Sequence, residues 1–226
     1  MDSNAQIISD LENKIGFHQT VDFLSECKGV PVVIKGQIVE VHPESILFQV
    51  EPPDSICMNR DEYALLLHDS FISGIQGRIL KFDLADGQIE VGGFTYSDRG
   101  FGGRAMVRVK PEAPIQAELF FGDIRLPCEV VDLSLNGFGI LTQPGQDIKF
   151  TKGQVTNIKL ELLNQEVEIS GTLVGVFPKD KNIRLAMSFS QDVPGQAAVV
   201  RYITRRRAEI REEIQAAYQT ALNNNA

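Results

Sequence analysis

Two hydrophobic patterns divide this chain. Over residues 30–94 and again over residues 105–189, apolar and β-branched side chains recur at every second position, which is typical of strands with one buried face. Near both ends of the chain, apolar residues instead recur at the spacing of one helical face. The pattern predicts a mostly β protein with short N-terminal helices and an amphipathic C-terminal helix.

The terminal helices follow from these spacings. Three apolar residues precede Gly16 on one helical face: Ile8, Leu11 and Ile15. We interpret Val21 and Leu24 as the apolar face of a second short helix that ends near Gly29. The C-terminal helix is predicted to end near Leu222, before a frayed tail at residues 223–225. One stripe of apolar residues defines it: Val199, Ile203, Ile210, Ile214, Ala217 and Ala221.

The alternating segments predict strands in both halves of the chain. In the first half they lie at residues 32–41, 46–50, 71–82 and 88–91, and Asp86-Gly87 marks a hairpin between the last two. In the second half they lie at residues 105–109, 115–121, 125–131, 137–141, 157–162, 166–176 and 183–189. Small antiparallel sheets must close or be covered to hide their edges. A glycine-rich stretch at residues 92–103 resembles a flexible connection, so we place two domains at residues 1–98 and 99–226.

Composition and charge exclude several classes of protein. The net charge is −8, opposite to that of proteins that track along nucleic acid, so an anionic ligand would need a local basic patch. The N-terminus lacks the basic and apolar regions of a signal peptide, and no apolar run is long enough to span a bilayer. We therefore expect a cytoplasmic protein with no membrane insertion and no nucleic acid as a partner.

Cysteine and histidine residues give no sign of a metal site. The cysteines are far apart without metal-ligand spacing, so we expect reduced thiols that pack as small hydrophobic side chains: Cys27, Cys57 and Cys128. The histidines lie in the first third of the chain and pair with no nearby cysteine: His18, His42 and His68. We expect neither a metal nor another cofactor.

A basic segment follows the glycine-rich stretch. Residues 99–111 contain Arg99, Arg104, Arg108 and Lys110 and no acidic residue. On an extended strand, positions 104 and 108 face the same side, and a guanidinium donates in a rigid fork to phosphate oxygens or to guanine O6 and N7. Taken alone, the pair is also compatible with a solvated or salt-bridged face. Residues 100–105 fit the dinucleotide pattern G-x-G-x-x-A, but a β-like segment follows where a helix is required, which excludes that interpretation.

A second motif, Asp132-Leu133-Ser134-Leu135-Asn136-Gly137, is predicted to form a turn. In the ordinary interpretation, Asp132 and Ser134 cap backbone N–H groups and Gly137 supplies a positive φ. In the chemical interpretation, the carboxylate accepts hydrogen bonds from the N1–H and N2–H₂ groups of guanine, and the hydroxyl contacts phosphate or base. The glycine then lets a flat ring approach the backbone closely.

Together, the two motifs resemble the PilZ domain family. The resemblance rests on Arg104-x-x-x-Arg108, on Asp132-x-Ser134-x-x-Gly137 and on a predicted closing strand at residues 185–189. The first half resembles, more loosely, the β-barrel that precedes PilZ in flagellar-brake-type proteins. The resemblance implies two tandem small antiparallel β-barrels, an N-terminal split-barrel-like domain and a C-terminal PilZ barrel followed by a helix.

By this resemblance, the chain is a bacterial receptor for the second messenger cyclic di-GMP. The implied ligand-binding residues are Arg99, Arg104, Arg108, Asp132, Ser134 and Gly137. Ligand would change the arrangement of the two domains and offer a new surface to an unidentified protein partner, in control of motility, biofilm or exopolysaccharide output. Gly103 stands where many relatives carry another basic residue, which leaves open whether one ligand or a stacked pair is bound. A homodimer is also left open.

Competing hypotheses come from other classes of protein. One is a PilZ-fold interaction module without nucleotide binding, against which the intact motif residues argue. Another is a nucleic-acid-binding tandem barrel, against which the negative charge, the 8% aromatic content and the absence of tryptophan argue. We expect no enzyme, because the sequence contains no P-loop, nucleophile elbow or metal-helix motif. Arginines 205–207 are expected on a solvated helical face, with ligand gating or partner docking as the alternative.

Overall fold

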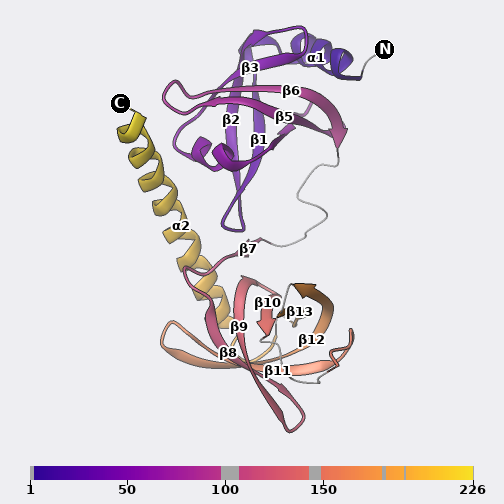
Figure 1. Ribbon diagram of the computed structural model, residues 1–226, viewed down its shortest axis with the longest axis vertical. Coiled ribbons are helices and arrows are strands. Elements are labelled where there is room, and N and C mark those ends of the chain that lie inside the picture. Colours follow the sequence, from indigo (N-terminus) through magenta and orange to yellow (C-terminus); the bar gives the residue numbers. More distant parts are fainter. Residues whose placement is uncertain (1–2, 98–106, 143–148, 180–181, 191, 226) are drawn as a thin grey trace. The chain divides into compact units, whose positions relative to one another are not determined.

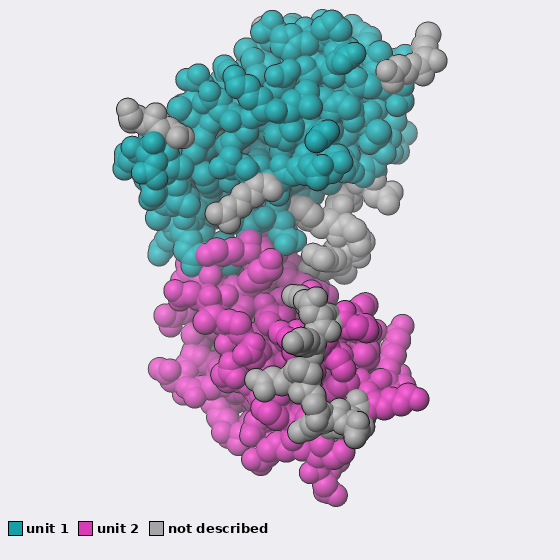
Figure 2. All heavy atoms as spheres, in the orientation of Figure 1, with its two compact units in different colours: residues 1–27, 31–104, 210–226 teal, residues 28–30, 105–209 magenta. Residues whose placement is uncertain are grey.

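Antiparallel strands dominate the computed structural model of the chain, which describes residues 3–97, 107–142, 149–179, 182–190 and 192–225 (Figure 1). The chain divides into two compact units. Unit 1 contains residues 1–27, 31–104 and 210–226, and unit 2 contains residues 28–30 and 105–209 (Figure 2). The predicted boundary between residues 98 and 99 lies outside the described residues and stays a prediction. The predicted mostly β fold is confirmed.

Six antiparallel strands close a barrel in unit 1. They are β1 (Thr20–Cys27), β2 (Val30–Val41), β3 (Ser45–Val50), β4 (Tyr63–Leu67), β5 (Gly74–Asp83) and β6 (Gln88–Ser97), arranged in the order β1-β2-β3-β6-β5-β4. Helix α1 (Ser3–Lys14), two 3-10 segments, η1 (Gly16–His18) and η2 (Asp54–Arg60), and residues 210–225 of the C-terminal helix also belong to this unit. Closure pairs each strand on both sides, which meets the requirement that a small sheet hide its edges.

Aromatic side chains fill this first barrel. Phe23 and Phe48 are fully buried and meet edge to face with ring centroids 5.0 Å apart. Gly36 lies against them, and a Cβ built there would stand 2.3 Å from the Phe23 ring, so β2 requires a glycine at this position. Helix α1 is fixed beside β6 because the backbone N–H of Phe94 donates to the side-chain oxygen of Asn4 at 2.7 Å.

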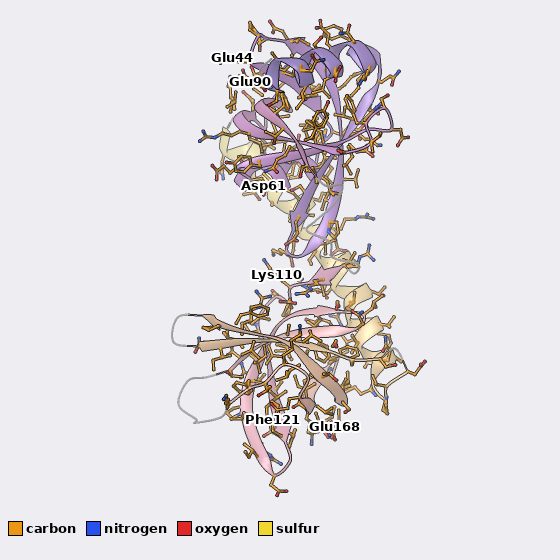
Figure 3. All side chains as sticks on the ribbon, turned by 90° about the vertical axis from the view of Figure 1, so that its right-hand side faces the viewer. Glu44, Asp61, Glu90, Lys110, Phe121 and Glu168 are labelled. Carbon is orange, nitrogen blue, oxygen red and sulfur yellow. The ribbon has the colours of Figure 1, made fainter. Side chains whose placement is uncertain are left out.

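The segment at residues 20–27 is strand β1, so the predicted second helix is wrong. Val21, Phe23 and Ser25 are buried at every second position, which is the alternation of a strand. Leu24, which helical spacing would pair with Val21, is only half-buried. The Ser25 hydroxyl donates at 2.7 Å to a carboxylate oxygen of Asp61, so this inward polar group is satisfied. Asp61 is labelled in Figure 3.

Unit 2 contains a second closed barrel. Its strands are β8 (Ile115–Phe121), β9 (Ile124–Ser134), β10 (Gly137–Thr142), β11 (Val155–Leu162), β12 (Gln165–Lys179) and β13 (Asn182–Ser188), in the order β10-β13-β12-β11-β8-β9, and β9 pairs with β10 to close it. The two-residue strand β7 (Arg108–Val109) pairs with the end of β9, beyond the part that pairs with β8. The predicted pair of small antiparallel barrels is confirmed.

Connections between strands match the sequence in most places. Leu163 and Asn164 both adopt positive φ, 54° and 62°, in the turn between β11 and β12. Gly87 has a φ of 63° in the predicted hairpin between β5 and β6. The glycine-rich stretch differs from its prediction, because β6 continues to Ser97, so residues 92–97 are strand. Of the strand predicted at residues 105–109, Arg108–Val109 is strand, and residues 105 and 106 lie outside the described residues.

Helix α2 (Gln196–Asn225) is the predicted amphipathic helix and extends through the asparagines that were expected to fray. Its apolar stripe is buried at Val199, Ile203, Ile210 and Ile214. The prediction that arginines 205–207 lie on a solvated face is wrong for Arg206. Its side chain is buried, with only 2% of the residue exposed, and its Nε donates to the backbone oxygen of Lys110 at 3.0 Å. This hydrogen bond ties α2 to the residue that follows β7.

The cysteines are free thiols, as predicted. Cys57 and Cys128 are buried and Cys27 is half-buried. Burial raises the pKa of Cys128 to about 12, so its thiol stays neutral. Among the described residues, no helix combines the length and the apolar character needed to cross a membrane.

We expect Gly36→Ala to lower the free energy of unfolding by about 1–3 kcal/mol, because the added methyl group presses into the Phe23 ring. Urea denaturation measures this loss. Combined with Phe23→Leu, which removes the ring edge, the glycine substitution should cost less than it does alone. Strictly additive losses would contradict this packing.

Candidate ligand-binding site

The two sequence motifs meet on the outer face of the barrel in unit 2. Arg108 on β7 lies directly opposite Ser134 on β9, and Ser134 lies opposite Gly137 on β10. Directly opposed residues of antiparallel strands project to the same face of the sheet. The adjacent pair, Val109 and Leu133, is fully buried inside the barrel. Arg108, Ser134 and Gly137 therefore share the outer face.

Asp132 carries the carboxylate of this site, and its side chain is only 8% exposed. The Nη1 group of Arg108 donates to Oδ1 at 3.3 Å, and the Nη2 group of Arg184 on β13 donates to Oδ2. A carboxylate removed from water is costly unless paired charges and hydrogen bonds replace its hydration. Two arginines from different strands supply that replacement, one to each oxygen.

A β-bulge and a glycine aim the carboxylate toward β13. Asp132 lies opposite Gly139, but Ile140 lies opposite Val130, so Val131 is an extra residue on β9. A Cβ built at Gly139 would stand 2.2 Å from the carboxylate of Asp132. The carboxylate thus lies over the bare backbone of β10, and this position gives it access to Arg184 on the next strand.

Ser134 and Gly137 shape the end of the β9–β10 hairpin. The Ser134 hydroxyl lies 3.2 Å from the side-chain oxygen of Asn136 and donates to the backbone oxygen of Gly137 at 3.2 Å. A Cβ at Gly137 would stand 2.6 Å from the backbone oxygen of Met187, so β10 and β13 approach closely only because this residue is glycine. Because this glycine has no side chain, nothing projects from β10 at this point of the outer face, between Ser134 and β13.

The predicted turn at residues 132–137 is smaller than expected. Asp132 and Ser134 belong to β9, Gly137 begins β10, and only residues 135 and 136 form the turn. Gly137 does not adopt the positive φ expected of it, and the close approach of β13 explains the glycine instead. The prediction failed here because turn chemistry and a tight hairpin use the same residue types.

The structure brings four of the predicted ligand-binding residues together: Arg108, Asp132, Ser134 and Gly137. The other two, Arg99 and Arg104, lie outside the described residues. Sequence analysis missed Arg184, which is 52 residues from Asp132 along the chain and belongs to neither motif. The available signal was weak: Arg184 is the one charged residue of strand β13 and lies at an outward position.

The comparison with protein-family models covers the segment that contains this site. Residues 103–205 match the family model described as the PilZ domain. No curated protein matches the chain.

Solved structures that are similar to the chain include the following three. The structure of YcgR from Escherichia coli in complex with c-di-GMP is 14% identical, with 94% of this chain and 92% of that chain covered and a TM-score of 0.44. The inhibitor of motility MotI/DgrA from Bacillus subtilis is 13% identical, with coverages of 84% and 96% and a TM-score of 0.43. The complex of MrkH from K. pneumonia with c-di-GMP is 14% identical, with coverages of 92% and 94% and a TM-score of 0.44.

We expect Arg184→Gln to lower the free energy of unfolding by about 1–2 kcal/mol, because the buried carboxylate of Asp132 loses a charge-assisted hydrogen bond. The loss is limited because Arg184 is 42% exposed. Denaturant unfolding at neutral pH measures it.

Arg125→Gln is the matched control. Arg125 is 64% exposed and lies 3.5 Å from Glu118, which is itself exposed, so its removal should change stability by less than about 0.5 kcal/mol. Equal losses in the two variants would contradict the role given to Arg184.

Proposed function

We propose, from the premise that residues 103–205 of the chain are a PilZ domain, that the chain is a receptor for cyclic di-GMP and makes or breaks no bond in it. One observation carries the proposal: on the outer face of that domain, Arg108 pairs with a carboxylate that Arg184 already holds. This arrangement sets a partly exposed cation, Arg108, beside a carboxylate acceptor, and a guanine nucleotide needs both.

Most N–H groups of the Arg108 guanidinium are available to donate to a ligand. Its side chain is 39% exposed, and its one hydrogen bond among the described residues is the 3.3 Å contact with Asp132. A guanidinium carries five N–H donors in a fork that matches phosphate oxygens or the O6 and N7 atoms of guanine. The hydrogen bond to Asp132 is long, so exchanging it for a phosphate oxygen costs little.

Asp132 then becomes an acceptor for the base. When Arg108 turns to the ligand, Oδ1 of Asp132 is released while Oδ2 remains paired with Arg184. An ionised carboxylate only accepts hydrogen bonds, and guanine presents N1–H and N2–H₂ side by side on its Watson–Crick edge. Adenine lacks both donors at these positions, so this acceptor favours guanine over adenine. Arg184 acts here as a positioning residue that keeps the carboxylate aimed.

The affinity of such a site is within ordinary limits. Micromolar binding corresponds to about −8 kcal/mol, and each charge-assisted hydrogen bond contributes about 1.5–3 kcal/mol. A few such contacts suffice, even in a chain with a net charge of −8. Arg99 and Arg104 are proposed to add phosphate contacts from the segment that precedes β7.

We expect Arg108→Ala to weaken cyclic di-GMP binding at least tenfold, measured by isothermal titration calorimetry, because the loss of one charge-assisted contact corresponds to about that factor. Arg125→Ala is the matched control, since Arg125 is an exposed arginine of the same unit that is paired elsewhere. Unchanged affinity in Arg108→Ala would refute the role of Arg108.

The unmodified chain should also distinguish two cyclic dinucleotides. Cyclic di-AMP has the same phosphates and no guanine donors, so it should bind at least tenfold more weakly. If neither nucleotide binds, the chain is a PilZ-fold interaction module and the proposal fails.

The proposal includes a response to the ligand. Arg99 and Arg104 lie in the stretch that joins β6 and β7 in the sequence, and this stretch contains Gly100, Gly102 and Gly103. Ligand captured by these arginines would change the arrangement of the two domains and present a new surface to a protein partner. We expect small-angle X-ray scattering to show a changed radius of gyration on adding cyclic di-GMP, and no change in Arg108→Ala. An identical scattering curve with ligand bound would contradict this step.

A further inference from the structure

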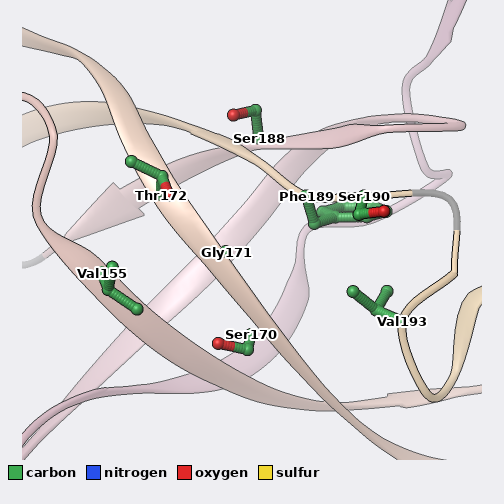
Figure 4. A pocket seen from close by; sticks show the side chains of 8 residues that line it. All are labelled: Val155, Ser170, Gly171, Thr172, Ser188, Phe189, Ser190 and Val193. Atoms are coloured by element: carbon green, nitrogen blue, oxygen red, sulfur yellow. The ribbon is translucent and has the colours of Figure 1, made fainter.

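Two of the three cysteines of the chain lie in unit 1, on elements that pack against each other. Cys27 is the last residue of β1, and Cys57 lies in η2. The pocket in Figure 4 belongs instead to unit 2, where its lining residue Ser188 is opposite Gly137 of the candidate ligand-binding site. The cysteine pair is therefore a feature of the other unit.

One hydrogen bond fixes where β1 and η2 meet. The Ser25 hydroxyl on β1 donates at 2.7 Å to Asp61, the residue that follows η2. Cys27 follows Ser25 on the same face of the strand, about 7 Å along it. Cys57 precedes Asp61 by four residues, which is about 8 Å along a 3-10 segment. Because these displacements from one fixed contact are similar, the two thiols can meet.

The two thiols are in contact and differ in their surroundings. A side-chain hydrogen bond joins Cys27 and Cys57. Cys27 is half-buried, whereas Cys57 is only 9% exposed. The hydrogen bond with Cys27 and burial raise the pKa of the Cys57 thiol. The nearby carboxylates of Asp54 and Asp61 raise this pKa further, so Cys57 stays protonated. A small oxidant in water therefore meets the sulfur of Cys27 first, and a second sulfur lies beside it.

The third cysteine, Cys128, provides an internal comparison. It lies on β9 of unit 2 and is only 3% exposed, and burial raises its pKa to about 12. Oxidation of a thiol requires access to the oxidant and thiolate character. Cys128 lacks both of these properties, so it should remain reduced under conditions that oxidise an exposed thiol.

We propose that Cys27 and Cys57 form a reversible disulfide within one chain when hydrogen peroxide is the oxidant, with Cys27 reacting first. The Cys27 thiolate attacks the peroxide, the O–O bond breaks, and the leaving hydroxide takes up a proton to become water. Cys27 is then a sulfenic acid. The Cys57 sulfur attacks the sulfur of Cys27, the S–S bond forms, the S–O bond breaks, and water leaves with the proton of the Cys57 thiol.

The two steps balance. Two thiols and one hydrogen peroxide give one disulfide and two water molecules, so the sulfurs are oxidised and the peroxide oxygens are reduced. The sulfurs need only close from hydrogen-bond contact to the disulfide length of about 2.05 Å. A dithiol such as dithiothreitol reverses the reaction by thiol–disulfide exchange.

The test treats the unmodified, folded chain with hydrogen peroxide and counts free thiols by alkylation in denaturant and mass spectrometry. Because the chain has three cysteines, we expect the number of free thiols to fall from three to one, with the remaining thiol at Cys128. Peptide mapping should place the cross-link between Cys27 and Cys57 of the same chain. Dithiothreitol should restore all three thiols.

Two variants separate the roles of the cysteines. Cys128→Ala is the matched control, and its free thiols should fall from two to none. Cys57→Ala should form no disulfide and should keep a sulfenic acid at Cys27, which dimedone labels. An unmodified chain that retains three free thiols after peroxide, or that forms cross-links only between chains, would overturn the inference. Absence of dimedone label from Cys27 in Cys57→Ala would overturn the proposed order of reaction.

Discussion

A nearly buried carboxylate held between two arginines is the interaction on which the site depends. Asp132 is shielded from water, so it must be paired, and each of its oxygens receives one guanidinium. The two partners differ in kind. Arg184 stands on a strand of the closed barrel, whereas Arg108 stands on the two-residue strand β7. This difference supports the proposal that Arg184 holds the carboxylate and that Arg108 leaves it for the ligand.

The closed barrel makes this arrangement possible. Strand register fixes which residues share the outer face, and a bulge at Val131 brings Asp132 into line with Gly139. Gly139 leaves the backbone bare beneath the carboxylate. The same register places Gly137 between Ser134 and Ser188 on the outer face. The proposed binding residues, which are separated along the chain, thus become neighbours at strand spacing.

The sequence predicted most of the strands because alternation is a local property that each strand shows by itself, and the resemblance to the PilZ family implied that they close into two barrels. The prediction from hydrophobic spacing failed at β1, because Val21 and Leu24 also fit the spacing of a helix. The burial of Phe23 and Ser25, which only the structure shows, identifies the segment as a strand. Prediction from the sequence also failed for Arg206, because a basic run on a helix gives no sign that one member is buried against the backbone oxygen of Lys110. Arg184 was missed for a related reason: its meeting with Asp132 depends on which strands become neighbours, and no local pattern encodes that. Asp132, Ser134 and Gly137 could be grouped from the sequence because their short spacing places them on one hairpin.

The central claim is that Arg108 exchanges Asp132 for ligand while Arg184 stays in place. Nuclear magnetic resonance of ¹⁵N-labelled arginine side chains reports this exchange directly during titration with cyclic di-GMP, with signals assigned by Arg108→Lys and Arg184→Lys. The account predicts that the Arg108 guanidinium signals shift with ligand concentration and saturate, while those of Arg184 keep their position. Saturable binding that shifts Arg184 and leaves Arg108 unchanged would contradict it.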